Sequence, residues 1–298
     1  MQSEPAELSI KAASEMLGVP IPTIRSWQRR YGLADPERSV GGHRRYSMSE
    51  LKWLAAFRDQ IDAGVPARVA ALSFGDTDPR LGSFLRAAAT FDSFAMDRQL
   101  ESLAKAEGLE SAVTDLLMPA MAMIGDLWKS EDLDVAHEHL ATQAVRSWMS
   151  RRAARAARES GAASGPAAVL AAAPDEHHTI GIEALALLLS IRGWRCRVLG
   201  SQTPADSLQR AVQRLAPDAT VVSAQLSVNR AGAVRSLRQL SDLGCSAYFG
   251  GRAFAAASSR RGVKGTYLGH DLSAAADQIA LLPVPPGRPI KSRREKRK

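Results

Sequence analysis

The second half of the chain alternates short apolar runs with longer helical stretches, and this alternation sets narrow limits on the fold. The apolar runs are 167–173, 195–200, 219–224, 246–251 and 266–269. Stretches with helical periodicity lie at 179–192, 204–215, 230–243 and 271–281. Strands that alternate with helices predict βαβ units and a parallel, doubly wound α/β sheet of the Rossmann-like type. Ligands bind such sheets beyond the carboxyl ends of the strands, so chemistry is expected in the loops that follow them.

The residues before this region show a different pattern. Between 80 and 157 the apolar side chains recur at helical spacing, which predicts an α-helical, four-helix bundle. The sequence SGAASGP at 160–166 is typical of a flexible break between two periodic regions. The sequence therefore predicts a multidomain chain, with an N-terminal domain at 1–76, a helical bundle at 77–160, an α/β domain at 161–283 and a tail at 284–298.

Composition excludes some classes of protein. Hydrophobic residues make up 45% of the 298 residues, so packed cores are expected. Cys196 and Cys245 lie far apart and form no CxxC pair, which fits a reducing compartment. The first residues lack a signal-peptide pattern, and no apolar run approaches the ~20 residues that span a bilayer. A cytoplasmic location without a membrane partner is expected.

The positive charge is concentrated at one end. The net charge is +8, and residues 284–298 contain seven Lys or Arg residues and one Glu. This basic tail is either a disordered, solubilising end or an additional phosphate contact that does not depend on DNA sequence. Charge alone therefore does not identify a DNA-binding protein.

The first segment has the pattern of a helix-turn-helix. Leu8–Leu17 is predicted to form a helix capped by Ser9, and Gly18-Val19-Pro20 breaks it. A second helix is predicted from Pro22, with Arg and polar side chains near its start, as a reader of the major groove requires. Two glycines and the sequence His-Arg-Arg-Tyr follow at 41–46, where a tight turn could present basic groups to a phosphate backbone.

The motifs TIRSWQRRYGL and GGHRRY, at this spacing, resemble the MerR family of winged-helix regulators. The resemblance implies double-stranded operator DNA as a partner, read by the second helix and gripped by a wing. The implied DNA-binding residues are Thr23, Arg25, Gln28, Arg29, Arg30, His43, Arg44, Arg45 and Tyr46. Trp27 and Tyr31 are either part of this surface or core residues. Metal sensing is disfavoured, because the two cysteines are not clustered and buried packing is expected for both.

A second motif follows the first predicted strand. Glu176, His178 and Gly181 form a Glu-x-His-x-x-Gly sequence in the loop after residues 167–173. Ser223 ends the third predicted strand, and Gly250-Gly251 ends the fourth. Because all of these residues follow parallel strands, they are expected to converge on one edge of the sheet.

This set resembles the cobalamin-binding fold shared with methionine synthase and some mutases. The resemblance implies that His178 is the lower axial ligand of cobalt and that Glu176 orients its imidazole. Ser223 is implied to hydrogen-bond the buried base of the cofactor, and the glycines, Gly181, Gly250 and Gly251, to give the nucleotide tail room. His177 is a rival ligand but lacks the matching spacing. One departure is Gln225, where the family pattern has Leu or Thr.

The bundle carries a third motif, Trp128 followed after nine residues by Glu138-His139. By spacing alone these residues could be ordinary core and surface positions. The pattern, however, resembles MerR-type photoregulators of the CarH/LitR kind, whose bundle caps adenosylcobalamin. The resemblance implies that Trp128 packs over the adenosyl group and that Glu138 and His139 contact it. Some of these photoregulators have a His directly after the Trp, which can bind cobalt once the alkyl group is lost. Here that position is Lys129, and a protonated Lys is not a ligand. His137 and His139 are the two candidates to take its place.

The function implied by this resemblance is a light-responsive transcriptional repressor with adenosylcobalamin as its chromophore. It would form a homo-oligomer, a tetramer, on its operator in the dark and leave DNA when light breaks the cobalt–carbon bond, with carotenoid genes as its targets. A light-independent corrinoid sensor is the alternative. A corrinoid enzyme subunit or methyl carrier is disfavoured because it needs no DNA reader, and no nucleophile or acid–base constellation predicts an enzyme.

Overall fold

The computed structural model describes residues 8–34, 36–38, 42–75, 77–159 and 165–281. These residues form two compact units, which meet between Val145 and Arg146 within one long helix, α9 (Val135–Glu159). The predicted tail at 284–298, residues 160–164 of the predicted break and Gly41, the first residue of the GGHRRY motif, lie outside the described residues.

The first unit begins with the helix-turn-helix and a small antiparallel sheet. The strands pair in the order β1-β3-β2, so that β3 lies between the other two. The elements of this part are β1 (Leu8–Ser9), α1 (Ile10–Leu17), α2 (Ile21–Tyr31), β2 (Glu37–Arg38), β3 (Arg44–Tyr46), α3 (Met48–Asp62) and α4 (Ala67–Ala71). The β2–β3 pair corresponds to the predicted wing.

The predicted start of the first helix needs a small correction. Leu8 and Ser9 are strand residues, because their backbones pair with Tyr46 and Arg45 of β3. Ser9 is nevertheless the predicted cap: its extended backbone precedes α1, and its hydroxyl accepts a hydrogen bond from the amide N of Ala12 at 3.2 Å. The second helix begins one residue earlier than predicted, at Ile21.

The rest of the first unit belongs to the predicted bundle. Its helices are α5 (Pro79–Ala89), α6 (Ser93–Ala106), α7 (Leu109–Ser111), α8 (Met118–Lys129) and the first part of α9, with a π-helical segment, η1 (Ala112–Leu117), between α7 and α8. The apolar side chains predicted to face inward include Phe84, Leu85 and Leu116, and these are buried. In α9, where Leu140, Ala144 and Trp148 are predicted to face inward, Leu140 and Ala144 are half-buried, and the buried side chains are Ala141, Val145 and Trp148. Helical periodicity therefore predicted the bundle, although the buried face of α9 is shifted by one residue at two positions.

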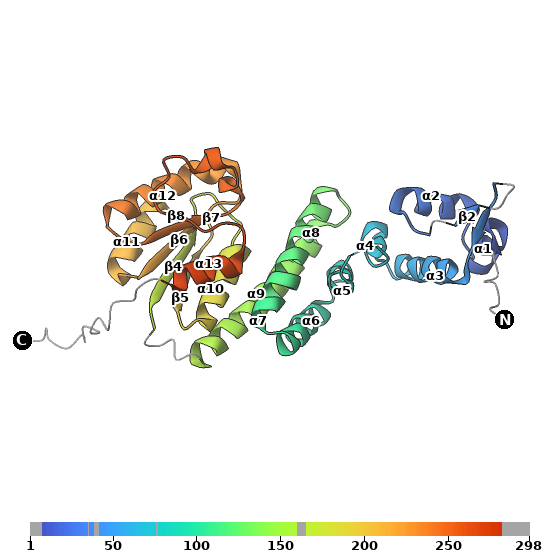
Figure 1. Cartoon of the computed structure of the whole chain (residues 1–298), viewed down its shortest axis with the longest axis horizontal. Coiled ribbons are helices and arrows are strands. Elements are labelled where there is room, and N and C mark those ends of the chain that lie inside the picture. Colours follow the sequence, from blue (N-terminus) through green and yellow to red (C-terminus); the bar gives the residue numbers. More distant parts are fainter. Residues whose placement is uncertain (1–7, 35, 39–41, 76, 160–164, 282–298) are drawn as a thin grey trace, which may run out of the picture. The chain divides into compact units, whose positions relative to one another are not determined.

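The second unit contains a five-stranded parallel sheet with the strand order β5-β4-β6-β7-β8 (Figure 1). Its strands are β4 (Ala167–Ala172), β5 (Arg195–Gly200), β6 (Ala219–Ser223), β7 (Ala247–Gly250) and β8 (Thr266–Tyr267). Its helices are α10 (Ile180–Ile191), α11 (Ala205–Leu215), α12 (Arg230–Asp242) and α13 (Leu272–Ala280), with short 3-10 turns at η3 (Ser227–Asn229), η4 (Arg252–Phe254) and η5 (Ala257–Arg260). The predicted Rossmann-like, doubly wound fold is confirmed, and each strand and helix lies within a few residues of its predicted position.

The helices cover both faces of this sheet. Helices α11 and α12 pack together on one face, where Leu208, Leu237 and Val222 belong to the same buried cluster. Helices α10 and α13 pack together on the other face, with α10 against β4 and β5. Side chains alternate between the faces along each strand, so the residue that follows Val222, Ser223, points toward the side of α10.

No helix in the described part of the chain combines the length and the apolar character that a membrane span requires.

Candidate functional site: a carboxylate–imidazole pair at the switch point of the sheet

The strand order indicates where on this sheet a ligand would bind. The chain runs from β4 outward to β5 and then returns to the other side of β4 to form β6. The connections after β4 and β6 therefore lead away from each other, which leaves a crevice at the carboxyl ends of these two strands. Glu176 and His178 follow β4, and Gln225 follows β6, so the predicted motif residues border this crevice.

Glu176 is the best-connected side chain of this site. Its side chain is 0% exposed and accepts five hydrogen bonds from the described residues. Oε1 accepts from the amide N of His178 at 3.0 Å and from its ring Nδ1 at 2.5 Å. Oε2 accepts from the amide N atoms of Gln225 at 2.7 Å and Leu226 at 3.1 Å, and from Nδ2 of Asn229 at 3.1 Å. Glu176 therefore ties the loop after β4 to the loop after β6.

These contacts fix the charge of Glu176. Burial alone raises the pKa of a carboxyl group, but the hydrogen bonds from His178, Leu226 and Asn229 outweigh it and lower the pKa of Glu176 to about 2. Glu176 is consequently a carboxylate at neutral pH and can only accept hydrogen bonds.

The carboxylate also fixes the tautomer of His178. Since Glu176 accepts at Nδ1, the proton of the neutral imidazole lies on Nδ1 and the lone pair lies on Nε2. The His178 side chain is 57% exposed although its partner is buried. A metal-ligating imidazole is commonly held by a carboxylate in this way. The chemistry of this pair therefore fits the role of an axial ligand that binds through Nε2.

His177 lacks these features. Its Nδ1 lies 3.4 Å from Nε2 of Gln202, both side chains are exposed, and Glu176 does not contact its ring. The geometry thus favours His178 over His177 as the candidate ligand, as the motif spacing does.

Small side chains form a row beside the pair. Ala172, Ser223 and Gly250 are register partners on three adjacent strands, at or next to their carboxyl ends. Ser223 is 6% exposed, and its buried hydroxyl oxygen has no hydrogen-bond partner among the described residues. A buried hydroxyl without a partner is costly, so this atom marks a place where a ligand atom would complete the structure. Gly181 lies in the first turn of α10, which packs on this face.

The two glycines after β7 have different roles. A Cβ atom on Gly250 would meet nothing within 4 Å, whereas one on Gly251 would lie 2.2 Å from the carbonyl oxygen of Ala224. Gly251 also has a φ of +102°, which side chains disfavour. Gly250 therefore leaves open space around its Cα, whereas Gly251 is needed for the close approach of its own loop to the backbone of Ala224, just after β6.

A paired substitution separates these roles. Gly251→Ala should destabilise the second unit by about 2 kcal/mol or more, because backbone atoms must shift to admit the new methyl group. Gly250→Ala should leave thermal unfolding nearly unchanged and weaken corrinoid binding. Thermal unfolding followed by circular dichroism, with a corrinoid titration of each variant, checks both expectations. Equal unfolding temperatures for the two variants would contradict the distinction.

Arg146, which the motifs did not single out, connects helix α9 to the histidine loop. Its Nε lies 3.2 Å from Oε1 of Glu183, and its Nη2 donates to the hydroxyl of Thr179 at 2.5 Å. The Thr179 hydroxyl in turn donates to Glu183 at 2.6 Å. Because Thr179 is buried and follows His178 directly, this network restrains the backbone that carries the imidazole.

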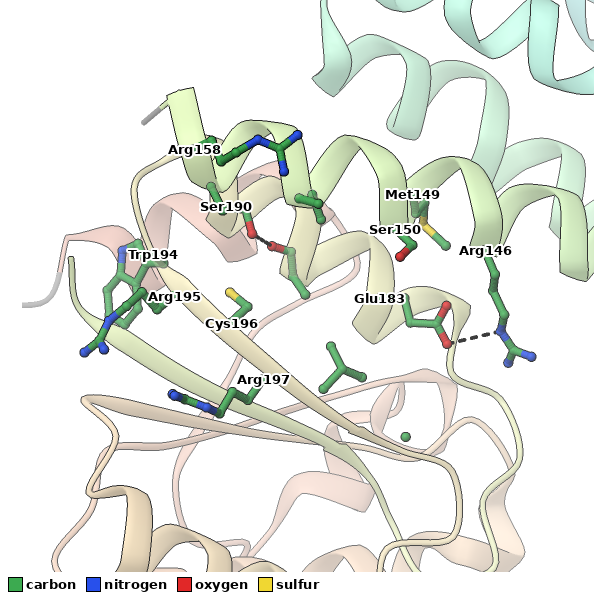
Figure 2. A pocket seen from close by; sticks show the side chains of 16 residues that line it. Arg146, Met149, Ser150, Arg158, Glu183, Ser190, Trp194, Arg195, Cys196 and Arg197 are labelled. Atoms are coloured by element: carbon green, nitrogen blue, oxygen red, sulfur yellow. Dashed lines mark hydrogen bonds and ion pairs between the residues drawn. The ribbon is translucent and has the colours of Figure 1, made fainter. Parts of the chain in front are cut away.

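The same arginine stands at one end of a groove of about 760 Å³ between α9, α10 and the edge strand β5 (Figure 2). Arg158, Arg195 and Arg197 also line the groove, and its remaining lining is largely apolar. Cys196 lies there, and burial raises the pKa of its thiol to about 12. Cys196 and Cys245 are both half-buried, whereas buried packing was predicted for both. None of the predicted site residues lies in the groove.

In the first unit, the predicted bundle residues lie at the end of α8 and the beginning of α9. Trp128 is 46% exposed. Oε1 of Glu138 accepts a hydrogen bond from the Thr142 hydroxyl at 2.8 Å, and its Oε2 lies 3.7 Å from Nε2 of His139. The His139 ring is 72% exposed. All three are thus accessible to a ligand of this unit.

Their neighbours Lys129 and His137 have other partners. Nζ of Lys129 lies 3.2 Å from a carboxylate oxygen of Asp126, as expected of a charged ammonium group. The His137 ring stacks on Phe91 with centroids 4.1 Å apart, and its Nδ1 accepts a hydrogen bond from the amide N of Asp134 at 3.1 Å. An imidazole whose Nδ1 accepts carries its proton on Nε2. Of the two histidines considered as substitutes, His139 is therefore the better placed to offer a lone pair.

The DNA-reading residues predicted on α2 are presented unevenly. Arg25, Arg29 and Arg30 are exposed, while Thr23 and Gln28 are half-buried. Gln28 donates from Nε2 to the carbonyl of Ala34 at 3.3 Å. Trp27 and Tyr31 pack against the buried Phe57, with ring centroids 4.9 and 5.8 Å away. For these two aromatic residues the core alternative is the one that the packing supports.

In the wing, His43 is exposed and Arg44 and Arg45 are half-buried, but Tyr46 differs from the expectation. Its side chain is 0% exposed. Burial raises the pKa of its hydroxyl above the usual value. Adjacent strand residues point to opposite faces, so Tyr46 enters the core when Arg45 does not. Tyr46 is therefore removed from the predicted DNA contacts.

Three parts of the chain match known protein families. Residues 8–72 match the MerR HTH family of regulatory proteins, and residues 81–152 and 166–275 match two families of B12 binding domains. The chain is similar to the HTH-type transcriptional repressor CarH of Myxococcus xanthus, with 31% identity over 82% of this chain and 88% of the relative. The chain is also 30% identical to the HTH-type transcriptional repressor CarA of the same organism, over 72% of this chain and 76% of the relative.

Among solved structures, a monomethylamine corrinoid protein of Methanosarcina barkeri aligns with a TM-score of 0.54 and 15% identity, covering 68% of this chain and 96% of that chain. At this identity the likeness concerns the fold alone. The sequence relatives decide the family: the chain belongs to the MerR-type helix-turn-helix transcriptional regulators that carry B12-binding domains, together with CarH and CarA.

Proposed function

We propose that this protein is a light-responsive transcriptional repressor that uses adenosylcobalamin as its chromophore. In the dark it binds its operator as a homo-oligomer, a tetramer, and it leaves the DNA after illumination. Carotenoid genes are the proposed targets, and the cytoplasm is the proposed location. The relatives CarH and CarA, which are transcriptional repressors, support the regulatory part of this proposal.

One observation carries the proposal: the Glu176–His178 pair at the carboxyl end of β4. Oε1 of the buried carboxylate lies 2.5 Å from Nδ1 of His178 and accepts its hydrogen bond, and no described residue hydrogen-bonds Nε2 of that ring. Beside it, Ser223 offers an unpartnered buried hydroxyl, and Gly250 leaves open space. These groups together match a corrinoid whose own base is replaced on cobalt by an imidazole and accommodated in the sheet.

When bound, adenosylcobalamin supplies a cobalt–carbon bond that visible light breaks. The protein supplies placement and electrostatics. His178 would bind the cobalt through Nε2, and Glu176 would keep the imidazole in the tautomer that leaves Nε2 unprotonated. Trp128, Glu138 and His139 would contact the upper group, and the exposed surface of Trp128 supports this assignment. Loss of that group would change what these bundle residues contact and so bias the oligomer.

The DNA-binding part of the proposal rests on α2 and the wing. An oligomer presents several winged helices at once, so that multivalency strengthens operator binding without any new contact. Dissociation of the oligomer in the light would therefore release DNA even though each reader is unchanged.

A second function, a light-independent corrinoid sensor, is favoured by one observation: Lys129, where some photoregulators have a histidine, is ion-paired with Asp126. In that case corrinoid abundance alone would shift DNA affinity. Equal operator responses to methyl-, cyano- and adenosylcobalamin would support this second function, because these compounds differ in the upper group.

The absorption spectrum of the purified protein with adenosylcobalamin tests the chromophore assignment. We expect binding in the dark to change the spectrum in the way that an imidazole replacing the lower base does, and green light to change it again. A spectrum identical to that of free adenosylcobalamin would refute the corrinoid site. A dark-type spectrum that survives illumination would refute the photoreceptor.

The wing and α2 give a separate prediction. Arg25→Ala should weaken operator binding by about tenfold or more, because an exposed arginine of the reading helix is lost. Tyr46→Phe should change operator affinity by less than about twofold, because the Tyr46 ring is buried and contacts no DNA. Gel-shift titrations at one salt concentration measure both values. A large loss of affinity in a stably folded Tyr46→Phe variant would restore Tyr46 to the DNA surface.

A further inference from the structure

Gln225 follows β6, two residues after Ser223, at the carboxyl end of the strand. Its backbone is fixed, because its amide N donates to Oε2 of Glu176 at 2.7 Å. Its side-chain Oε1 accepts from the amide N of Arg252, in the loop after β7, at 3.2 Å. Its Nε2 faces the first turn of α10, since a Cβ atom on Gly181 would lie 3.7 Å from it. The amide thus spans the space between the loop after β7 and α10.

The surroundings of this amide are otherwise small and weakly polar. Ala172, Ser223 and Gly250 form the adjacent row on the sheet, and among the described residues no hydrogen bond partner is found for Nε2 of Gln225. Oε1 retains a second lone pair after accepting from Arg252. One donor group and one acceptor position of a half-buried side chain are therefore free at the slot.

We propose that Gln225 determines which nucleotide base of the corrinoid this protein accepts, and that it favours an adenine base over 5,6-dimethylbenzimidazole. The inference rests on the proposed corrinoid binding and adds to it a selectivity for the lower base. Both bases are flat and fill a slot bordered by small residues. They differ in the hydrogen-bonding groups on their edges.

Adenine presents an amino donor next to ring-nitrogen acceptors, a pattern that the amide of Asn or Gln can pair with through two hydrogen bonds. Dimethylbenzimidazole, once displaced from cobalt, presents a single ring nitrogen, for which the unpartnered hydroxyl of Ser223 suffices. Its methyl-bearing edge would bury Nε2 of Gln225 without a hydrogen-bond partner, which costs free energy. A leucine at this position would shift the preference from adenine toward dimethylbenzimidazole, because its side chain has no polar group that the methyl-bearing edge would leave without a hydrogen bond.

The test is a pair of equilibrium titrations of the full-length protein in the dark. The probes are the cyano forms of adeninyl- and dimethylbenzimidazolyl-cobamide, which share the corrin ring and the upper ligand. Binding is read from the absorption change when the imidazole becomes the lower ligand. We expect the wild type to bind the adeninyl form about tenfold more tightly, and Gln225→Leu to shift the ratio of the two dissociation constants by about tenfold or more toward dimethylbenzimidazole.

Two further variants keep the proposal falsifiable. Gln225→Met, which has nearly the same length without the amide, should behave like Gln225→Leu if the leucine variant folds poorly. Leu226→Ala is the matched control, since Leu226 is exposed in the same loop and only its backbone contacts Glu176. It should leave the ratio within about twofold. Unchanged ratios in Gln225→Leu and Gln225→Met would overturn the inference while leaving the corrinoid site intact. Failure of the wild type to bind either probe would overturn the corrinoid site itself.

Discussion

Replacing His178 by Ala is expected to weaken cobalamin binding by about 100-fold and to remove the spectral change that marks an imidazole as lower ligand. The physical reason is that Glu176 holds Nδ1 of His178 and so leaves the lone pair of the imidazole on Nε2, where it can bind cobalt. Spectrophotometric titration of the dark protein measures both effects.

His177→Ala is the control for this prediction. His177 is adjacent in sequence and similarly accessible, but its ring contacts Gln202 instead of Glu176. Its removal should change the dissociation constant by less than about twofold. If His177→Ala abolished the spectral change and His178→Ala did not, the ligand assignment would be reversed.

Replacing Glu176 by Gln should have the second large effect, and it should act on the fold as well as on the cofactor. A glutamine amide would place donor hydrogens against groups that already donate: the amide N atoms of Gln225 and Leu226, or the ring of His178. We expect a loss of about 3 kcal/mol in the free energy of unfolding of the second unit. The variant should also bind cobalamin more weakly, because the His178 tautomer is no longer fixed.

The pH dependence of stability gives this prediction a sharper form. The pKa of Glu176 is lowered from 4.5 to about 2 in the folded protein. A lowered folded-state pKa means that its stabilisation is fully present above about pH 4.5 and is lost as the pH falls toward 2. Between pH 4.5 and 2, the free energy of unfolding of the wild type should therefore fall by about 3 kcal/mol more than that of Glu176→Gln. Acid unfolding of both proteins by circular dichroism checks the difference, and parallel curves would contradict the assigned charge state.

Local pattern was enough to predict the sheet, its helices and the bundle. The strands at 167–173 and 195–200 are short, apolar or alternating, and bounded by breaks, and the structure has them almost unchanged. The motif residues at the switch point could also be found, because parallel strands bring their carboxyl ends to one edge.

The support of the histidine could not be predicted in the same way. Asn229 donates to Glu176 from 53 positions along the chain, and Arg146 restrains the histidine loop from a different helix. Such contacts depend on how β4 and β6 pair and on where α9 packs, which no local spacing encodes. Tyr46 is a different case: strand alternation after the turn could have indicated that it faces the core when Arg45 does not.

The central claim is that light acts on operator binding through the bound corrinoid. The most direct test measures operator binding of the same sample, loaded with adenosylcobalamin, in the dark and after green light. We expect tight binding in the dark and a loss of about 100-fold after illumination, because the oligomer and its multivalent contact are lost. His178→Ala should show no such light dependence. Equal operator binding before and after illumination, in a protein shown to hold adenosylcobalamin, would contradict the account.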